Sequence, residues 1–214
     1  MDRITFEQIP ELFESIGSLF VEKKDELCEM DARLGDGDLG LTMSKGFGAL
    51  PEILRGESEG AAGDAGKLLM KAGMKMSSLV PSTMGFLMST GVMEGGKALK
   101  GKNEIGAAEL AEYLTGFAAG VQKRGKCEAG QRTIYDAILP AAQAAAQAAA
   151  VEGASLQDVV RAAYEAAQAG VEATKDMVPV FGKAAVHAAQ CAGVADQGAV
   201  AGCYMIRGIY TYIC

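Results

Sequence analysis

Two helical patterns are separated by the segment Asp31-Ala32-Arg33-Leu34-Gly35-Asp36-Gly37-Asp38-Leu39-Gly40-Leu41-Thr42. It places three carboxylates, those of Asp31, Asp36 and Asp38, in a glycine-broken turn. Carboxylate oxygens are hard ligands that suit Mg²⁺ or Ca²⁺, and glycines let a backbone fold around an ion or approach a phosphate. Repulsion between like charges makes such a cluster unfavourable in free energy unless a cation or hydrogen-bond donors lie among the oxygens. The segment therefore predicts a metal site.

Two familiar motifs do not fit this segment. An EF-hand loop that starts at Asp36 requires Glu at its twelfth position, where this chain has Phe47. The Asp-x-Asp-x-Thr loop of a phosphatase requires Thr or Val at position 40, which is Gly. A solvated Asp/Gly loop, with Asp36 or Asp38 capping the next helix, stays open as an alternative.

Composition predicts an all-α protein. Half of the 214 residues are apolar, alanine is abundant and Trp is absent. Apolar residues recur at spacings of three and four almost throughout, and no stretch alternates as a strand does for more than a few residues. No shift in composition marks a boundary, so residues 1–214 are expected to form a single domain.

Charge and cysteine content exclude several classes of function. The net charge of −7 argues against nucleic acid and anionic membranes as partners. The five cysteines form no C-x-x-C pair, which is typical of a reducing compartment, and the one histidine, His187, excludes a histidine-based metal site. With no signal-peptide pattern or apolar run of membrane-spanning length, a soluble, cytoplasmic protein is expected.

Apolar periodicity and capping residues predict eight helices, an antiparallel up-and-down barrel or bundle with its ligand site at one end. Their expected ranges are 5–30, 41–54, 61–79, 83–99, 106–123, 133–151, 155–177 and 199–213, with one or two further turns in 184–192. Residues 56–60 are expected to be a polar link, and Pro81 should end the third helix. In such a bundle alternate links share one end.

The links that share this end are the Asp/Gly turn, residues 80–83, residues 124–133 and the link that holds Lys183 and Asp196. They bring together carboxylates, hydroxyls at helix N-termini and a few cations. Helix N-termini hold anions, and Mg²⁺ bridges carboxylates to phosphates. This combination of groups favours a Mg-nucleotide as the ligand at this end of the bundle.

Three motifs carry a family resemblance: Gly35-Asp36-Gly37-Asp38-x-Gly40, Gly120-Val121-Gln122-Lys123-Arg124-Gly125-Lys126, and Gly130-x-x-Thr133-x-x-Asp136 with Pro140. In this order they resemble the nucleotide-binding L subunit of dihydroxyacetone kinase, over nearly the whole chain. The resemblance implies a DAK2-type helical barrel that holds ADP or ATP through Mg²⁺ at one end. It implies a kinase subunit that is active only with partners.

In the phosphotransferase-linked form of that family, a phosphohistidine-carrying M-type subunit recharges bound ADP. A K-type subunit binds dihydroxyacetone, or a related small ketose or polyol, and receives the phosphoryl group. A chain of 214 residues resembles this form. The acceptor itself and the oligomeric state stay open, a homodimer included.

The resemblance assigns roles to individual residues. Asp31, Asp36 and Asp38 become the Mg²⁺ ligands, and Lys183 becomes the catalytic cation near the phosphates. The nucleotide contacts it implies are Leu39, Gly40, Leu41, Thr42, Ser82, Thr83, Gly85, Gly125, Thr133, Ile134, Lys183, Asp196, Gln197 and Gly198. The chain departs from the family with Leu39 for His, Thr42 for Asn, Lys183 for Arg and Gln197 for Pro, and its turn at residues 80–84 is poorer in glycine.

These departures keep a second function open. A nucleotide-sensing regulatory or scaffold module would bind ADP, or nothing, and act on a transcription regulator or kinase subunit without turnover. A helical bundle with an acidic loop and no ligand is the remaining alternative.

Overall fold

The computed structural model describes residues 1–186, 188 and 191–214, without the side chain of Lys183. It confirms the all-α prediction. The described helices are α1 (Ile9–Glu22), α2 (Lys24–Ala32), α3 (Leu39–Ala61), α4 (Ala65–Leu79), α5 (Thr83–Ala98), α6 (Ala107–Gly125), α7 (Tyr135–Ala149), α8 (Leu156–Ala173), α9 (Gly182–Val186) and α10 (Gln197–Ile213). Two-residue strands, β1 (Ile4–Thr5) and β2 (Glu104–Ile105), pair antiparallel with Ile4 opposite Ile105.

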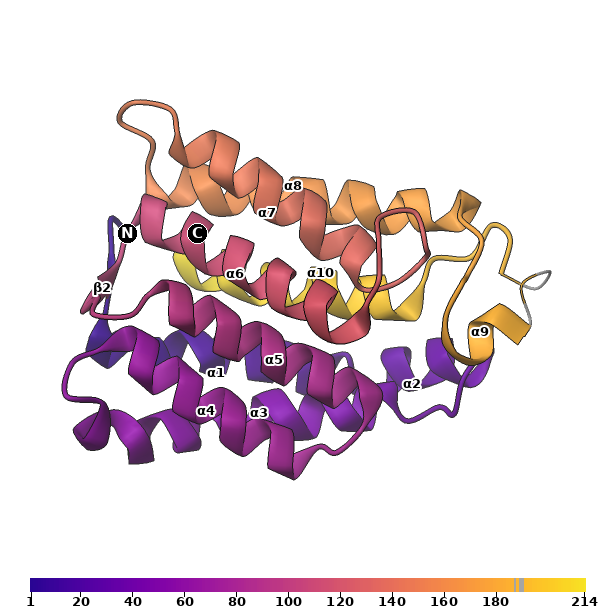
Figure 1. Ribbon diagram of the computed structural model, residues 1–214, viewed down its shortest axis with the longest axis horizontal. Helices are drawn as coiled ribbons and strands as arrows, with labels where there is room; N and C mark the ends of the chain where they lie inside the picture. The colour runs from indigo at the N-terminus through magenta and orange to yellow at the C-terminus, as the bar shows by residue number, and fades with distance from the viewer. Residues whose placement is uncertain (187, 189–190) are drawn as a thin grey trace.

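The long helices form a closed ring in which each packs on the next along the chain. The order is α1, α3, α4, α5, α6, α7, α8 and α10, and α10 closes the ring against α1. They run along the long axis of the molecule, and both chain ends and the β1–β2 pair lie at one end of it (Figure 1). None of the described helices combines the length and apolar character needed to cross a membrane.

One apolar core fills the centre of the ring. Phe20 on α1 stacks on Phe47 of α3, with ring centroids 4.7 Å apart, and Phe117 of α6 is buried on the opposite side. Fully burying such side chains contributes about 1.5–3 kcal/mol each. The core is continuous across the ring, so α1 and α10, although distant in sequence, are held together by it.

The first predicted helix is interrupted. Thr5 is the last residue of β1, Phe6–Gln8 form a 3-10 turn, and Lys23, with φ −91° and ψ 8°, separates α1 from α2. The separate α2 packs on α3. Gly40 makes this approach possible, because a Cβ at that position would overlap the carbonyl oxygen of Lys24.

The predicted polar link at 56–60 is wrong, because α3 continues to Ala61. Leu54 and Ala61 are both fully buried, and this burial outweighs the cost of about 1 kcal/mol for each glycine in a helix. The turn comes later, where Ala62 and Gly63 adopt φ of 53° and 79°. Asp64 then caps α4 by accepting a hydrogen bond from the Lys67 amide at 3.0 Å.

Other expected boundaries are confirmed. Pro81 ends α4, and Ser82 caps α5 by accepting from the Gly85 amide at 3.0 Å. Ser155 and Asp158 form the predicted capping box at the start of α8. Of the turns expected in 184–192, the structure shows α9, and residues 187, 189 and 190 lie outside its described part.

Closure of the ring can be tested at Gly208. A Cβ there would lie 2.6 Å from the Cα of Ile16 on α1, so Gly208→Ala should force α10 away from α1. We expect the free energy of unfolding to fall by about 1–3 kcal/mol, the usual cost of overpacking. Urea denaturation followed by circular dichroism measures this change in free energy.

Gly56→Ala is the control, because nothing lies within 4 Å of its Cβ position in the exposed part of α3. This substitution should raise the free energy of unfolding by about 0.5–1 kcal/mol. Equal stability of the Gly208→Ala variant and the wild type would contradict the packing argument.

Candidate functional site

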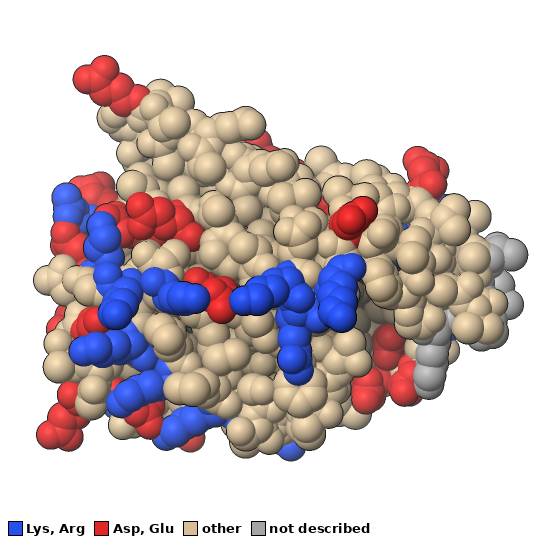
Figure 2. All heavy atoms as spheres, viewed as in Figure 1, with Lys and Arg blue, Asp and Glu red and all other residues tan. Residues whose placement is uncertain are grey.

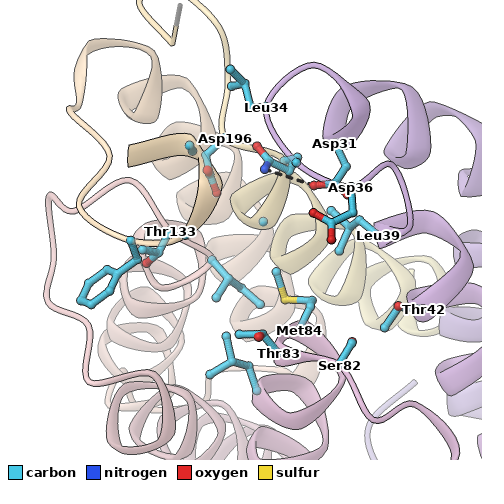
Figure 3. A pocket seen from close by; sticks show the side chains of 18 of the residues that line it. Asp31, Leu34, Asp36, Leu39, Thr42, Ser82, Thr83, Met84, Thr133 and Asp196 are labelled. Carbon is cyan, nitrogen blue, oxygen red and sulfur yellow. Dashed lines mark hydrogen bonds between the residues drawn. The ribbon is translucent and has the colours of Figure 1, made fainter. Parts of the chain in front are cut away.

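A cavity of about 320 Å³ lies where alternate links of the ring meet. The predicted convergence of these links is confirmed, since the lining comes from the Asp/Gly turn, the turn before α5, the loop before α7, and the segment from Phe181 to Gly198. The side chains that line it include Asp31, Leu34, Asp36, Asp38, Leu39, Thr42, Ser82, Thr83, Met84, Leu87, Arg132, Thr133, Ile134, Phe181, Asp196 and Gln197. Figure 3 shows Asp31, Asp36 and Leu39 on one side, Ser82 and Thr83 on another, and Thr133 and Asp196 opposite Asp36.

Four of the long helices begin at this cavity, α3, α5, α7 and α10, and the short α9 begins beside them. The N-terminus of each helix carries unsatisfied N–H groups and a partial positive charge. Neighbouring side chains satisfy some of them: Asp196 accepts from the Ala199 amide at 2.8 Å, and Thr133 Oγ1 accepts from the Tyr135 amide at 3.1 Å. Four converging N-termini make the cavity suited to an anion.

Asp31 organises the Asp/Gly turn from the end of α2. Its Oδ2 accepts hydrogen bonds from the amides of Gly37, at 2.9 Å, and Asp38, at 3.1 Å. Its Oδ1 accepts from Gln197 Nε2 at 3.3 Å, which ties the turn to the start of α10. Gly37 has φ 76°, a conformation that favours glycine. Asp31 is buried, so these donors compensate its charge within the protein.

Asp36 and Asp38 are exposed on the wall of the same cavity. Among the described residues, the structure gathers no group of three or more His, Cys, Asp or Glu side chains into an ion site. The three carboxylates of the turn thus lie in one region but differ in burial. Asp31 holds the backbone of the turn, and Asp36 and Asp38 are exposed residues of the cavity wall.

Sequence reasoning missed Arg132, whose guanidinium is fully buried beside Asp196. Its Nη2 donates to the carbonyl of Val194 at 3.0 Å, and its Nη1 lies 3.6 Å from Asp196 Oδ1. Nε and Nη1 of Arg132 have no hydrogen-bond partner in the described structure. The backbone of Arg132 has φ 58°, which is unfavourable for a residue other than glycine. A sequence pattern of polar loop residues gives no signal for that conformation.

Asp136 fixes the loop that carries Arg132. Its carboxylate is buried and accepts from the amides of Gly130, at 2.6 Å, and Thr133, at 2.7 Å. This arrangement explains the Gly130-x-x-Thr133-x-x-Asp136 spacing, because the first turn of α7 brings Asp136 back under the loop. Asp196, beside Arg132, is almost fully buried, and burial raises the pKa of its carboxyl to about 6.

Most of the predicted contact residues line the cavity, and four do not. Gly40 packs against α2, and Gly85 lies against Val80, whose carbonyl a Cβ at Gly85 would overlap. Leu41 is exposed outside the cavity, and Gly125 ends α6 close to Leu87. The side chain of Lys183 and the whole of His187 lie outside the described residues.

The donor set fits a divalent cation and a phosphate. Carboxylate oxygens of Asp36 and Asp38 are hard ligands, and the helix N-termini supply N–H groups for anionic oxygens. Gly198 leaves the start of α10 open, because a Cβ there would lie 3.0 Å from Asp196 Oδ2 and 3.1 Å from Met84 Cε. A volume of about 320 Å³ lies within the range for small-molecule sites.

Comparison with known proteins identifies the family. The model of the DAK2 domain matches residues 33–211. The chain belongs to the DAK2 domain family. It is 31% identical over 183 residues to the ADP-binding subunit of PEP-dependent dihydroxyacetone kinase 1 of Listeria innocua, covering 86% of this chain and 84% of that protein. It is 27% identical over 191 residues to the corresponding ADP-binding subunit of Escherichia coli, covering 89% of each.

A solved structure shares the DAK2 fold. The dihydroxyacetone kinase from C. freundii, crystallised with AMP-PNP and Mg²⁺, superposes with a TM-score of 0.71 at 24% identity. The superposition covers 96% of this chain and 34% of that kinase, so the chain spans about a third of the longer protein. The predicted resemblance to the L subunit of dihydroxyacetone kinase and the predicted fold are confirmed.

The buried carboxyl of Asp196 predicts a pH dependence of stability. Because its pKa in the folded chain, about 6, lies above its ordinary value of 3.8, the folded state binds the proton more tightly. The stabilisation is therefore present at low pH and is lost as the pH rises through about 6. Relative to Asp196→Asn, which can still cap α10, the wild type should lose unfolding free energy between pH 4.5 and pH 7.

Urea titrations of ligand-free protein across this range measure the difference. Asp158→Asn is the control, because hydrogen bonds from Ser155 lower the pKa of that exposed carboxyl, and its contribution changes only below this range. Parallel profiles for the wild type and Asp196→Asn would show that Asp196 stays ionised when buried.

Proposed function

We propose that residues 1–214 form one nucleotide-binding domain, the ADP/ATP–Mg²⁺ subunit of a dihydroxyacetone kinase-type enzyme. The observation that carries this function is the cavity itself, in which four helix N-termini meet exposed carboxylates. Relatives described as ADP-binding subunits, which align with this chain over most of their length, support it. The chain acts as a kinase subunit only together with partner subunits.

Within this proposal, Asp36 and Asp38 hold Mg²⁺ from the exposed wall, and Asp31 contributes through the turn that it orders. The starts of α3, α5 and α10 hold the phosphates, and the residues there that line the cavity are Leu39, Thr42, Ser82, Thr83, Gln197 and Gly198. Thr133 and Ile134 line the side assigned to adenine and ribose. Lys183 is retained as the cation near the phosphates.

The chemistry required of this chain is positioning and charge neutralisation. Phosphoryl transfer proceeds with charge on the oxygens of the transferred group, and a bound Mg²⁺ neutralises part of it. The chain's own residues hold and orient the nucleotide, and the helix N-termini stabilise negative charge in a partly enclosed cavity. The described lining contains no His, Lys or Cys side chain that could bind and activate an acceptor.

We therefore place the acceptor on a partner. We assign it to a K-type subunit that binds dihydroxyacetone or a related small ketose or polyol. An M-type subunit that carries a phosphohistidine would recharge ADP, since the relatives from Listeria innocua and Escherichia coli are subunits of PEP-dependent enzymes. Native mass spectrometry of the purified chain should show an increment of ADP plus Mg²⁺ that EDTA removes.

A regulatory or scaffold module remains the second candidate. This candidate is favoured by Asp31, whose carboxylate already accepts hydrogen bonds from backbone amides and from Gln197. Among the described residues, no cluster of three carboxylates is arranged to hold an ion. Addition of the K-type subunit, Mg-ATP and dihydroxyacetone distinguishes the two functions. Phosphorylation that depends on this chain supports the kinase, and tight Mg-ADP binding without turnover supports the module.

Asp36→Ala tests the metal assignment. Loss of an exposed carboxylate on the cavity wall should weaken Mg-ADP binding at least a hundredfold, because the bridging cation loses a charged ligand. The helical circular dichroism signal should not change. Asp25→Ala, at an exposed carboxylate of α2 outside the cavity, is the matched control. Isothermal titration calorimetry with Mg-ADP measures both variants, and normal binding by Asp36→Ala would show that the assignment is wrong.

A further inference from the structure

The surface beside the cavity carries a group of basic side chains. The sequence carries a net charge of −7, yet Figure 2 shows basic side chains gathered over the C-terminal end of α6, with acidic side chains to their right. The cations at the end of α6 are Lys123, Arg124 and Lys126, all of them exposed. We call these three residues the α6 basic rim.

The rim borders the cavity. The guanidinium of Arg124 lies over the ring of Phe86 in the first turn of α5, with Cζ 5.2 Å from the ring centroid. The next residue along α5, Leu87, lines the cavity, and a Cβ on Gly125 would lie 3.1 Å from Leu87 Cδ2. Arg124 is therefore held in place at the mouth by a cation–π contact.

The backbone at Lys126 gives a second observation. Lys126 follows the last turn of α6 with φ 51°, the left-handed conformation in which helices usually place glycine. Basic residues in the last turn of a helix are common because they complement its negative end, and this accounts for Lys123 and Arg124. It does not account for lysine instead of glycine at 126. A strained position that keeps a charged side chain points to a role for that side chain.

The three cations are also unpaired within the chain. Among the described residues, none of them lies within ion-pair distance of a carboxylate, whereas Lys71, Lys75 and Lys102 on the same face all do. An ion pair inside the chain would compete with a partner for these charges. The rim presents three exposed cations beside the cavity, and one of them, Arg124, is held in place by its contact with Phe86.

The geometry points to the α6 basic rim as the docking surface for an acidic face of the protein that presents the phosphoryl acceptor. This inference rests on the proposed function, in which the acceptor comes from a partner. The cavity supplies helix N-termini and carboxylates, and a partner must cover its mouth to bring an acceptor hydroxyl to the phosphate. The rim lies beside the mouth of the cavity, so an acidic face of the partner is attracted there, and this attraction orients the encounter.

The test is the rate of association with the K-type subunit from the same organism, measured by stopped-flow fluorescence at 30 mM and 300 mM NaCl. The triple variant Lys123→Glu, Arg124→Glu, Lys126→Glu should associate at least tenfold more slowly at low salt, and its rate should no longer fall with salt. The matched control is Lys67→Glu, Lys97→Glu, Lys100→Glu, which makes the same change in net charge with exposed residues on α4, α5 and the turn after α5. It should stay within threefold of the wild type.

Lys126→Gly gives a variant that is expected to fold, because glycine favours the left-handed conformation at this position. Glycine relieves the left-handed strain, so the melting temperature should rise while association with the K-type subunit slows about threefold. If Lys126 had only a structural role, its replacement would not raise the melting temperature and slow association at the same time.

Calorimetry with Mg-ADP separates the two proposals. All rim variants should bind Mg-ADP as the wild type does, since none of the three residues lines the cavity. Weakened Mg-ADP binding would place the rim in the nucleotide site and overturn the docking surface. Equal slowing by the control triple, or no association of the wild type with the K-type subunit, would also overturn it. Failure of the wild type to bind Mg-ADP would instead overturn the proposed function.

Discussion

Closure of the helical ring is the constraint on which the rest of the structure depends. When antiparallel helices close on themselves, alternate links must lie at the same end, because each helix reverses the direction of the one before it. The contact between α10 and α1, with Gly208 against Ile16, completes that closure. The four helices α3, α5, α7 and α10 then begin at one end, and their N-termini surround a single cavity. A site that binds anions follows from topology before any side chain is considered.

Electrostatics explains why such a cavity also needs carboxylates and a cation. Four helix N-termini attract anions of many kinds, and nothing in the backbone distinguishes a phosphate from a carboxylate. The acidic turn with Asp31, Asp36 and Asp38 satisfies some of this positive potential internally and leaves two exposed carboxylates on the wall. A free polyanion would be repelled by these carboxylates, whereas a polyanion that carries Mg²⁺ would not. The balance of charges thus favours a metal-bound phosphate over a bare one.

The sequence predicted the architecture because its signals were local and repeated. Apolar spacing, Pro81 and the caps at Ser82 and Ser155 agree with one another, and they sufficed to place most of the helices and the links that meet at the cavity. The polar link expected at 56–60 was wrong because burial of Ala61 outweighs glycine propensity, a tertiary effect. Gly40 and Gly85 matched a binding motif but face neighbouring backbone, and only coordinates distinguish close packing from contact with a ligand. Arg132 was missed since its burial beside Asp196 depends on residues 64 positions apart coming together.

In the loop before α7, two residues adopt unfavourable backbone conformations that place their side chains on the inside and the outside of the protein. The described part of the chain has three residues other than glycine at positive φ, namely Ala62, Lys126 and Arg132. Two of them are cations in this one loop, and each conformation costs on the order of 1 kcal/mol. Arg132 turns inward, where it links Val194 and Asp196 to the loop, and Lys126 turns outward beside the mouth of the cavity. Asp136 holds the part of the loop around Arg132, because its carboxylate accepts hydrogen bonds from the amides of Gly130 and Thr133. A single buried carboxylate thus fixes the backbone that places Arg132 beside Asp196.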